Sequence, residues 1–471
     1  MAIVASIPYD RAAVGDSDRQ VDADVVVAGA GGAGVTAALA AAERGLSVVL
    51  LEGSETFRED SNTAMSTSMV PAAGTRQQRE AGVEDTAELF LEDIQLKTAG
   101  TVDPTVARTL VDVAPVLIDW LAEAWGIDLE LVTDFNYPGH SRHRCHSVPD
   151  RAGSTLLRLL LGAVAQRDEI ALVCPARLDG IVADVDGSVE VAALMRPDGT
   201  REDVRTRSVI LATNGFGASP ELVREHCPEI VDGLYFGGEG SNGDALRFGA
   251  GLDADTACLD AYQGHGSVAY PHGVLLTWAT VVHGAFLVNA DGKRFADESP
   301  GYSELATPVL AQPENAAWMV YDARIDELCR PFADYQRCLE AGAVHEAKDV
   351  AALAEVIGTS AEVVASTLVG ARSCALGEAD DPLGRTDWAA PLEPPYRAVH
   401  VTGALFHTQG GLGIDSEARV QRGGSPIDGL YAAGGAAVGI SGHGASGYLA
   451  GNGLLAALGL GLVAGRAACC R

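Results

Sequence analysis

The sequence predicts an α/β protein in which a Rossmann-like nucleotide-binding domain is interrupted by an inserted α+β capping domain. Three observations predict this fold. A strand-like run at 24–28 leads into a glycine turn and an Ala-rich helix, and a second short strand at 429–433 also leads into glycines. Between them, residues 260–406 are richer in aromatic residues and histidine, which indicates a different, substrate-binding domain. The segments 21–259 and 407–471 should therefore form one discontinuous domain.

The segment 22–52 has the order of a dinucleotide-binding unit: strand, glycine turn, helix, strand and acid. Gly29 permits the sharp turn, Gly31 lets backbone N–H groups approach a pyrophosphate, and Gly34 lets the helix pack against its strand. The helix N-terminus favours the anion, and Glu52 is placed to accept hydrogen bonds from a ribose. The other explanation is a glycine-rich strand–helix turn in some other α/β protein.

Periodicity and turn residues predict the remaining elements of the nucleotide-binding domain. They are helices at 84–97, 103–125, 153–166 and 454–467, a hairpin of strands 178–185 and 188–195 joined at Asp186 and Gly187, and strands at 208–212 and 429–433. The strand at 208–212 runs into the turn Thr213–Gly217, which suits a second approach to the same nucleotide.

Composition excludes some partners and locations. The formal charge of −31 would repel nucleic acid, and the polar residues 1–20 contain no signal peptide and are expected to be a loose tail. Nine scattered cysteines lack metal-ligand spacing, which indicates reduced thiols, a cytoplasmic protein and no metal site. The run between Gly429 and Gly465 has no charged residue, but glycines interrupt it, so it predicts a buried loop and a core helix rather than a membrane span.

The cofactor is expected to be FAD, because a nicotinamide-binding domain usually occupies one continuous stretch. A helix that begins at Gly453 would direct its positive end at the N1–C2=O edge of a flavin. The most specific marks are ATNGFG at 212–217, GD at 243–244, GKRFADE at 292–298, HTQGG at 407–411 and LAGNG at 449–453. With these, the chain resembles the flavoprotein family of fumarate reductases, succinate dehydrogenase flavoprotein subunits and 3-ketosteroid dehydrogenases from about residue 22 to 467.

This resemblance implies a set of FAD-binding residues in both parts of the discontinuous domain. They are Gly29, Gly31, Gly32, Ala33, Gly34, Glu52, Gly53, Asn62, Thr63, Ser66, Thr213, Asn214, Asp244, Gly434, Gly435, Gly451, Asn452, Gly453 and Leu454. Members of the family link FAD covalently through a histidine in the early hydroxyl-rich segment. Because residues 61–75 contain no histidine, FAD should be bound non-covalently.

The resemblance also points to the reacting centre, where three arginines of fumarate reductases are replaced. Tyr302 stands at the proton-donating arginine, Val281 and Trp278 at an Arg and a Glu of the proton pathway, and Tyr448 at the arginine that clamps the substrate carboxylate. Without these guanidinium groups a dicarboxylate loses its bidentate partners. A neutral carbonyl substrate is therefore expected, and ketosteroid dehydrogenases carry a tyrosine base at the position of Tyr302.

The implied reaction is α,β-desaturation of a cyclic ketone, such as a 3-ketosteroid or a substituted cyclohexanone. The Tyr302 phenolate would take the α-proton, the β-hydrogen would leave as hydride to flavin N5, and Tyr448 would stabilise the enolate. His407 is expected beside the flavin or the substrate. The group that activates Tyr302 stays open among four side chains: His265, His272, His283 and Tyr137.

Two departures keep other interpretations open. The ketone-binding Tyr-Pro-Gly run of ketosteroid 1-dehydrogenases is absent from 441–446, which favours a smaller ketone bound by Tyr448 or His443. The same residues could instead reduce an activated alkene, as in fumarate reductases, or the chain could be a non-catalytic flavoprotein. A separate electron acceptor is expected, since no haem-attachment CxxCH occurs. The basic loop Arg142–Arg144 is expected to be solvated, the alternative being a contact with a substrate carboxylate.

Overall fold

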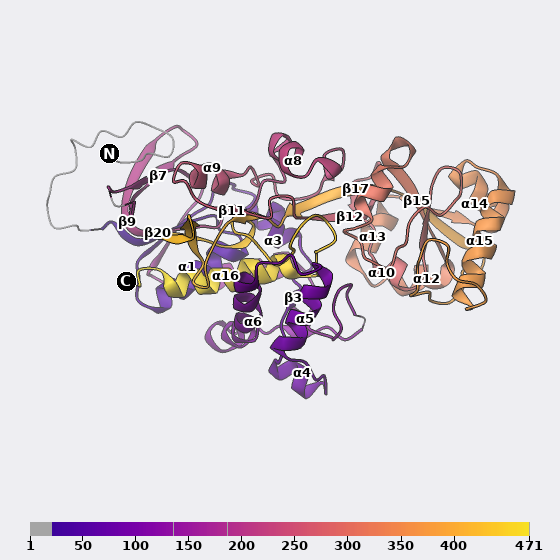
Figure 1. Cartoon of the computed structure of the whole chain (residues 1–471), viewed down its shortest axis with the longest axis horizontal. Helices are drawn as coiled ribbons and strands as arrows, with labels where there is room; N and C mark the ends of the chain where they lie inside the picture. Colours follow the sequence, from indigo (N-terminus) through magenta and orange to yellow (C-terminus); the bar gives the residue numbers. More distant parts are fainter. Residues whose placement is uncertain (1–20, 135, 186, 471) are drawn as a thin grey trace. The chain divides into compact units, whose positions relative to one another are not determined.

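The computed structural model describes residues 21–134, 136–185 and 187–470, and the chain divides into two compact units (Figure 1). Unit 1 holds the chain up to Cys227 together with Gly237–Tyr262 and the chain from His407 onward. Unit 2 holds Pro228–Phe236 and Gln263–Phe406. The chain therefore leaves unit 1 twice, and the first excursion, Pro228–Phe236, is too short for composition to reveal. The expected tail at residues 1–20 lies outside the described residues.

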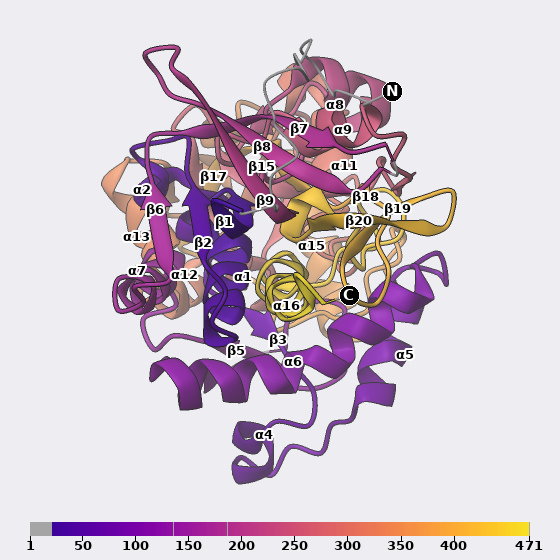
Figure 2. The ribbon, with the colours of Figure 1, turned by 90° about the vertical axis from the view of Figure 1, so that its left-hand side faces the viewer.

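Unit 1 is built on a mainly parallel sheet, which is shown end-on in Figure 2. Its strand order is β19 (Arg419–Arg422), β20 (Ser425–Ala432), β9 (Arg201–Leu211), β1 (Ala23–Ala28), β2 (Val48–Leu51) and β6 (Ile170–Val173). The strands from β20 to β6 pair in parallel, and β19 is an antiparallel edge. β7 (Arg177–Ala183) and β8 (Val189–Met195) extend β9 as an antiparallel hairpin. Because β20 pairs with β9, the predicted discontinuous Rossmann-like domain is confirmed.

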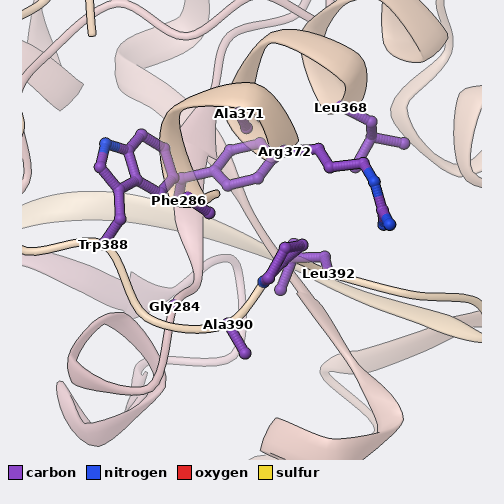
Figure 3. A pocket seen from close by; sticks show the side chains of 10 residues that line it. Gly284, Phe286, Leu368, Ala371, Arg372, Trp388, Ala390 and Leu392 are labelled. Atoms are coloured by element: carbon purple, nitrogen blue, oxygen red, sulfur yellow. The ribbon is translucent and has the colours of Figure 1, made fainter. Parts of the chain in front are cut away.

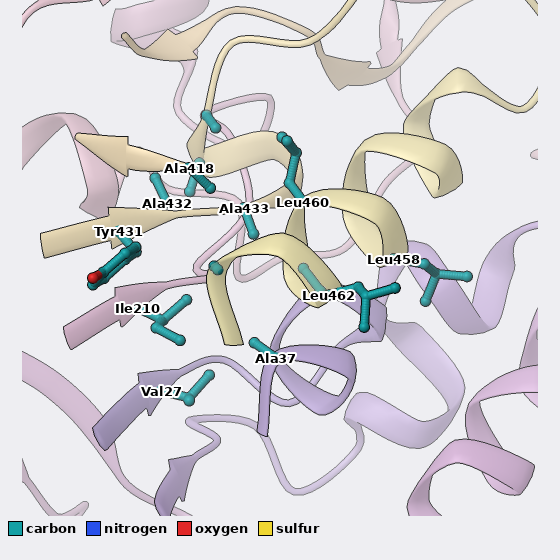
Figure 4. Packing of buried hydrophobic residues seen from close by; sticks show 14 of the residues in the cluster. Val27, Ala37, Ile210, Ala418, Tyr431, Ala432, Ala433, Leu458, Leu460 and Leu462 are labelled. Atoms are coloured by element: carbon teal, nitrogen blue, oxygen red, sulfur yellow. The ribbon is translucent and has the colours of Figure 1, made fainter. Parts of the chain in front are cut away.

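The core of unit 1 lies between this sheet and two apolar helices, α1 (Gly32–Glu43) and α16 (Asn452–Ala467). A Cβ atom at Gly461 would lie 2.4 Å from the carbonyl oxygen of Ala33, so the helix backbones are nearly in contact. Val27 and Ile210 of the sheet and Leu462 of α16 point into the same cluster (Figure 4). The uncharged run at the end of the chain is thus a buried loop and core helix, as predicted.

Three further helices lie within the ranges that periodicity predicted. α5 (Ala87–Lys97) is capped by the Thr86 side chain, α6 (Pro104–Trp125) by Asp103, and α7 (Gly153–Val164) starts without a side-chain cap. A separate three-stranded sheet has the order β3 (Val70–Pro71), β5 (Cys145–Ser147) and β4 (Glu130–Leu131). The shorter elements of unit 1 are α2 (Phe57–Asp60), α3 (Asn62–Met65), α4 (Arg76–Glu80), α8 (Pro220–His226), α9 (Asp244–Ala250), β11 (Thr256–Ala257) and β18 (Gly411–Leu412).

The expectation of a solvated basic loop is wrong for Arg144. Its side chain is fully buried and donates two hydrogen bonds to Asp85 at 2.9 Å and one to Asp93 at 2.6 Å. The guanidinium also lies 4.5 Å from the centre of the Phe90 ring. Arg142 alone matches the expectation, because it is exposed. Arg144 therefore fastens the loop to the segment before α5 and to α5 itself.

Unit 2 is an α+β unit with a largely antiparallel sheet. The strand order is β13 (Val274–Leu275), β12 (Tyr262–Ala269), β17 (Tyr396–Thr408), β15 (Ala316–Asp322) and β14 (Phe286–Val288), with β10 (Leu234–Tyr235) and β16 (Val344–Ala347) also on β17. The helices are α10 (Ala279–Val282), α11 (Ala306–Leu310), α12 (Ala323–Cys329), α13 (Ala333–Glu340), α14 (Val350–Ile357) and α15 (Ala361–Ala375). In the part of the chain that the structure describes, no single helix is long and apolar enough to cross a bilayer, although α14 and α15 pass that test jointly across a bend of 113°.

The GKRFADE segment of unit 2 forms a buried ion-pair network rather than a reactive site. Arg294 pairs with Glu298 at 2.6 Å and with Asp381 at 2.8 Å, and Arg385 approaches Glu298 at 3.4 Å. Arg385 also donates to the carbonyl of Val281 at 3.0 Å. Glu298 accepts the backbone N–H of Leu287 in addition. The network thus fixes the chain four residues before Tyr302.

Candidate cofactor and active site

The glycine turn between β1 and α1 contains two glycines that packing requires, Gly29 and Gly34, and one, Gly31, whose Cβ the protein itself would accommodate. A Cβ at Gly29, where φ is +104°, would lie 2.3 Å from the Ala212 carbonyl oxygen. A Cβ at Gly34 would lie 1.7 Å from the carbonyl oxygen of Gly29. At Gly31 a Cβ would meet Thr63 Oγ1 at 3.6 Å, an ordinary contact. Gly31 therefore leaves room at the N-terminus of α1, where a phosphate would bind.

Glu52 at the end of β2 holds this turn in place. One carboxylate oxygen accepts the N–H of Ala30 at 2.9 Å, and the other accepts the N–H of Ser54 at 2.9 Å. A carboxylate has about four acceptor positions, so Glu52 can still receive a ribose hydroxyl. Gly53 follows it directly, and a Cβ there would touch the Arg177 side chain at 3.6 Å.

The hydroxyl-rich segment closes one side of the turn. Thr63 Oγ1 accepts the N–H of Gly32 at 2.9 Å, and Asn62 Oδ1 accepts the N–H of Gly238 at 2.6 Å. Ser66 instead donates to the Thr63 carbonyl, and its own carbonyl accepts the N–H of Gly153 at 2.8 Å. Thr63 thus borders the glycine turn, Asn62 holds the segment at Gly238, and Ser66 supports the start of α7.

The turn after β9 lies against the C-terminal glycines, which joins segments about 220 residues apart in the chain. A Cβ at Gly435 would lie 2.8 Å from Asn214 Oδ1, and Asn214 itself has a φ of +67°. Gly434 approaches Ala33 of α1 in the same way. Thr213 Oγ1 is buried and has no hydrogen-bond partner within the described chain.

One other predicted residue, Asp244, follows a glycine that is hydrogen-bonded to this turn. The N–H of Gly243 donates to the Gly215 carbonyl at 3.0 Å, which brings the first turn of α9 to the loop. Asp244 in that turn forms an ion pair with Arg247 at 3.1 Å. Asp244 as a cofactor contact stays a prediction.

The N-terminus of α16, like that of α1, lies among predicted cofactor-binding residues of unit 1. Gly451 has a φ of +81°, and a Cβ there would lie 2.8 Å from the Met69 carbonyl oxygen. Asn452 is fully buried and donates from Nδ2 to Ser441 Oγ at 2.8 Å, while its Oδ1 is buried without a partner in the described chain. Leu454 follows as a buried residue of the core.

These features fit a bound dinucleotide. Gly31 offers a cradle that a Cβ would fill, and two buried oxygens, Thr213 Oγ1 and Asn452 Oδ1, have no hydrogen-bond partner among the residues that the structure describes. Native proteins seldom leave buried polar atoms unpaired, and a bound dinucleotide would supply partners for these two. Gly31 and Thr63 at the N-terminus of α1, and Gly451 and Asn452 at that of α16, are the predicted residues that fit this ligand best.

His407 and Tyr448 lie together in unit 1. Their rings meet edge to face with centroids 5.8 Å apart. His407 Nε2 would be 3.0 Å from a Cβ on Gly453, so the imidazole lies over the first turn of α16. Burial lowers the pKa of His407 to about 4, with the Thr408 backbone acting weakly in the opposite direction. His407 is therefore a neutral imidazole near neutral pH.

Tyr302 belongs to an aromatic cluster in unit 2. The His265 ring stacks on Tyr302 at 4.7 Å and on Phe406 at 5.2 Å, and Trp278 meets Tyr302 edge-on at 5.9 Å. Burial lowers the pKa of His265 to about 3, so it too is neutral. Trp278, which replaces a glutamate of fumarate reductases by the resemblance, thus contacts the tyrosine that replaces an arginine.

The structure narrows the groups proposed to activate Tyr302. His265 contacts the phenol ring, but stacked rings place its nitrogens poorly for a proton relay, and its Nδ1 lies 3.1 Å from Ser267 Oγ. His272 is exposed at a turn. Burial raises the pKa of Tyr137, which keeps that phenol protonated. Among the four, His265 is the one that the structure places against Tyr302 within unit 2.

No free guanidinium is available in unit 2, whose residues are all described. Its seven arginines each form an ion pair with an aspartate or a glutamate. A small hollow of about 10 Å³ beside α15 is lined by Phe286, Trp388 and Leu392 among others (Figure 3). A hollow of this volume holds about one water molecule, so it is too small to bind a substrate.

Several residues that shape the site lie outside the predicted set. Gln409 hydrogen-bonds His407 Nδ1 at 2.7 Å, and Ser441 bridges Gln409 and Asn452. Thr408 Oγ1 accepts the N–H of Phe216 at 3.1 Å. The position of Gln409 within HTQGG could have indicated its role. Ser441 could not be found in this way, because its partners lie 32 positions earlier and 11 positions later.

Replacing Gly31 or Gly34 of the glycine turn with alanine should have different effects. Gly31→Ala should fold normally but bind FAD at least about tenfold more weakly, which equals about 1.4 kcal/mol, because a methyl group occupies the phosphate position. Gly34→Ala should instead lower the unfolding midpoint of the apoprotein, since its Cβ would overlap the Gly29 carbonyl. Fluorescence titration of FAD and chemical unfolding separate the two effects. Wild-type FAD affinity in Gly31→Ala would refute the assignment of this cradle.

Comparison with known proteins identifies the cofactor. The sequence profile described as "FAD binding domain" matches residues 24–454, which is nearly the whole chain. The NADH:fumarate oxidoreductase of Klebsiella pneumoniae (strain 342) is 30% identical over 426 residues, which cover 89% of this chain and 45% of that protein. The chain thus spans less than half of this curated relative. The dinucleotide cradle of unit 1 accordingly binds FAD.

Solved structures show the same fold. The open conformation of a flavocytochrome c3 fumarate reductase matches with a TM-score of 0.79 and 27% identity, over 95% of this chain and 78% of that one. The 3-ketosteroid-Δ4-(5α)-dehydrogenase of Rhodococcus jostii RHA1 matches with a TM-score of 0.76 and 24% identity, over 98% of this chain and 99% of that one. The second likeness shows the fold alone.

Proposed function

Because the chain belongs to the family of FAD binding domains, we propose that it is a flavin-dependent oxidoreductase that desaturates the C–C bond next to a neutral ketone. The proposed substrate is a cyclic ketone, such as a 3-ketosteroid or a substituted cyclohexanone. FAD, when bound, supplies the two-electron acceptor. A separate protein or small molecule would then reoxidise it.

The absence of positive charge among the proposed reacting groups carries this proposal. By the resemblance, tyrosines or a valine occupy the three arginine positions, and every arginine of unit 2 is ion-paired. His265 and His407 are both neutral, since burial lowers their pKa values to about 3 and about 4. A dicarboxylate would find no cationic partner among these groups, whereas a ketone needs only hydrogen-bond donors.

The chain's own groups would act as follows. Tyr302 would accept the proton from the carbon next to the carbonyl, which is general base catalysis. His407 Nε2–H and the Tyr448 hydroxyl would donate hydrogen bonds to the carbonyl oxygen as negative charge develops there. His443, the other group considered for this task, is half exposed and bonded through Nδ1 to Asp260 at 2.7 Å. Tyr448, which is 7% exposed, is therefore the better of the two.

The reverse reaction, reduction of an alkene activated by a carbonyl, is the second proposed function. The observation that favours it is the name of the Klebsiella pneumoniae relative, a fumarate oxidoreductase that is 30% identical. The same Tyr302 would then donate a proton to the carbon rather than remove one. Fumarate itself is disfavoured because, by the resemblance, Tyr448 stands at the position of the clamping arginine.

A binding titration tests the choice of substrate class. The oxidised holoprotein is titrated with 4-androstene-3,17-dione, with cyclohexenones and with fumarate, while the flavin absorption spectrum is recorded. The enones should perturb the spectrum saturably, and fumarate should leave it unchanged at the same concentrations. Saturable perturbation by fumarate with silence from every ketone would overturn the proposal.

A further inference from the structure

A continuous chain of buried hydrogen bonds links the start of α16 to His407. Asn452 Nδ2 donates to Ser441 Oγ at 2.8 Å, and Ser441 Oγ donates to Gln409 Oε1 at 3.2 Å. Gln409 Nε2 lies 2.7 Å from His407 Nδ1. Asn452, Ser441 and Gln409 are each at most 5% exposed, so water does not compete for these bonds.

The donor-to-acceptor direction of these hydrogen bonds determines which ring nitrogen of His407 carries the proton. An amide nitrogen only donates, so the Ser441 hydroxyl accepts a hydrogen bond from Asn452 Nδ2. The Ser441 hydroxyl then donates its own proton to Gln409 Oε1. Gln409 is thereby held with its amide nitrogen toward the imidazole, and His407 Nδ1 must accept. The proton of the neutral ring is then on Nε2, the atom that lies over the first turn of α16.

The surroundings of His407 agree with a neutral donor. The positive end of the α16 dipole disfavours an imidazolium at this place. Tyr448 is the titratable side chain whose ring touches His407, and the three residues of the hydrogen-bond chain are uncharged. Asn452 Oδ1, at the far end, is buried without a partner in the described chain, so a donor from a bound ligand would lock the orientation.

We propose that Gln409 is a positioning residue that holds His407 as an Nε2–H donor for the carbonyl oxygen of a neutral substrate. The role in substrate binding rests on the function proposed above, whereas the position of the proton does not. Gln409 touches neither substrate nor reacting atoms in this account. It acts through His407, and Ser441 and Asn452 set its orientation.

The substitution Gln409→Glu replaces the donor to His407 Nδ1 with an acceptor and hardly changes the shape of the side chain. A carboxylate accepts from Nδ1–H, which moves the proton of the neutral ring away from Nε2, and it raises the His407 pKa. An imidazolium still carries Nε2–H, so the variant should work at low pH and lose activity as the pH rises through the raised pKa. The wild type should show no such loss, because its His407 is already a neutral Nε2–H donor above pH about 4.

Two measurements test the proposal. Long-range ¹H–¹⁵N spectra of histidine-labelled holoprotein, assigned with His407→Asn, report which ring nitrogen carries the proton. Wild type should show Nε2–H, and Gln409→Glu should show Nδ1–H at high pH. Ketone-dependent flavin reduction by Gln409→Glu should fall by on the order of 10²-fold at high pH, as for loss of one oxyanion donor. Gln409→Met, the matched uncharged control, should lose activity by a smaller factor without a new ionisation in its pH profile.

An Nδ1–H signal in the wild type would overturn the proposal, as would a Gln409→Glu profile that matches that of Gln409→Met. These outcomes differ from failure of the proposed function. If no ketone reduces the wild-type flavin while the tautomers are as expected, then Gln409 positions His407 and only the substrate class is wrong.

Discussion

Replacing Tyr302 with phenylalanine is expected to slow ketone-dependent flavin reduction by about 10²–10⁴-fold, the range for loss of a general base. The change removes only the hydroxyl, and the ring can keep its stacking on His265 and its edge contact with Trp278. FAD binding should stay unchanged, because the predicted cofactor residues belong to unit 1. Anaerobic stopped-flow reduction at saturating ketone measures the effect.

Tyr270→Phe is the matched control for this experiment. Tyr270 is also in unit 2 but is 49% exposed, so loss of its hydroxyl should leave the rate within about twofold of wild type, as for an ordinary surface change. Full activity in Tyr302→Phe would remove Tyr302 from the mechanism. Equal losses in both variants would indicate a general defect of unit 2.

The Arg144→Met substitution should lower the free energy of unfolding of unit 1 by about 3–5 kcal/mol, because it leaves buried Asp85 without its cationic partner. The Asp85 side chain is fully buried and would keep one hydrogen bond from Gln78 at 2.9 Å and one from the Thr86 N–H. Asp93 would lose its partner too, but it is partly exposed and can be hydrated. Chemical unfolding followed by circular dichroism measures the change.

Two comparisons isolate the ion pair. Arg142→Met, two residues earlier in the same loop, should change stability by less than about 0.5 kcal/mol because Arg142 is exposed. The double variant Arg144→Met, Asp85→Leu should recover part of the loss, since it no longer leaves a buried charge unpaired. A loss below about 1 kcal/mol in Arg144→Met would contradict the account of this loop.

The fold was predictable where the signal is local in the chain. The strand, glycine turn and helix of 23–43 are encoded by adjacent residues, and the strand predicted at 429–433 by its short apolar run, although β20 begins earlier, at Ser425. The excursion Pro228–Phe236 was missed because its membership of unit 2 depends on a two-residue strand, β10, that pairs with β17. Such pairing leaves no mark in the segment itself.

The site was less predictable, since its side chains act through distant partners. Arg144 was expected in solvent because its acidic partners lie 51 and 59 residues earlier. The GKRFADE residues marked the family correctly, yet Arg294 and Glu298 pair with each other and with unit 2 residues about 90 positions later. Gln409 lay within a recognised segment, but its role depends on Ser441 and Asn452.

Anaerobic reduction of the bound flavin by wild-type protein tests the central claim most directly. The oxidised holoprotein is mixed without oxygen with a panel of saturated 3-ketosteroids and substituted cyclohexanones, and with succinate in parallel. The account predicts bleaching of the flavin absorption by at least one ketone and none by succinate. Bleaching by succinate alone would contradict it.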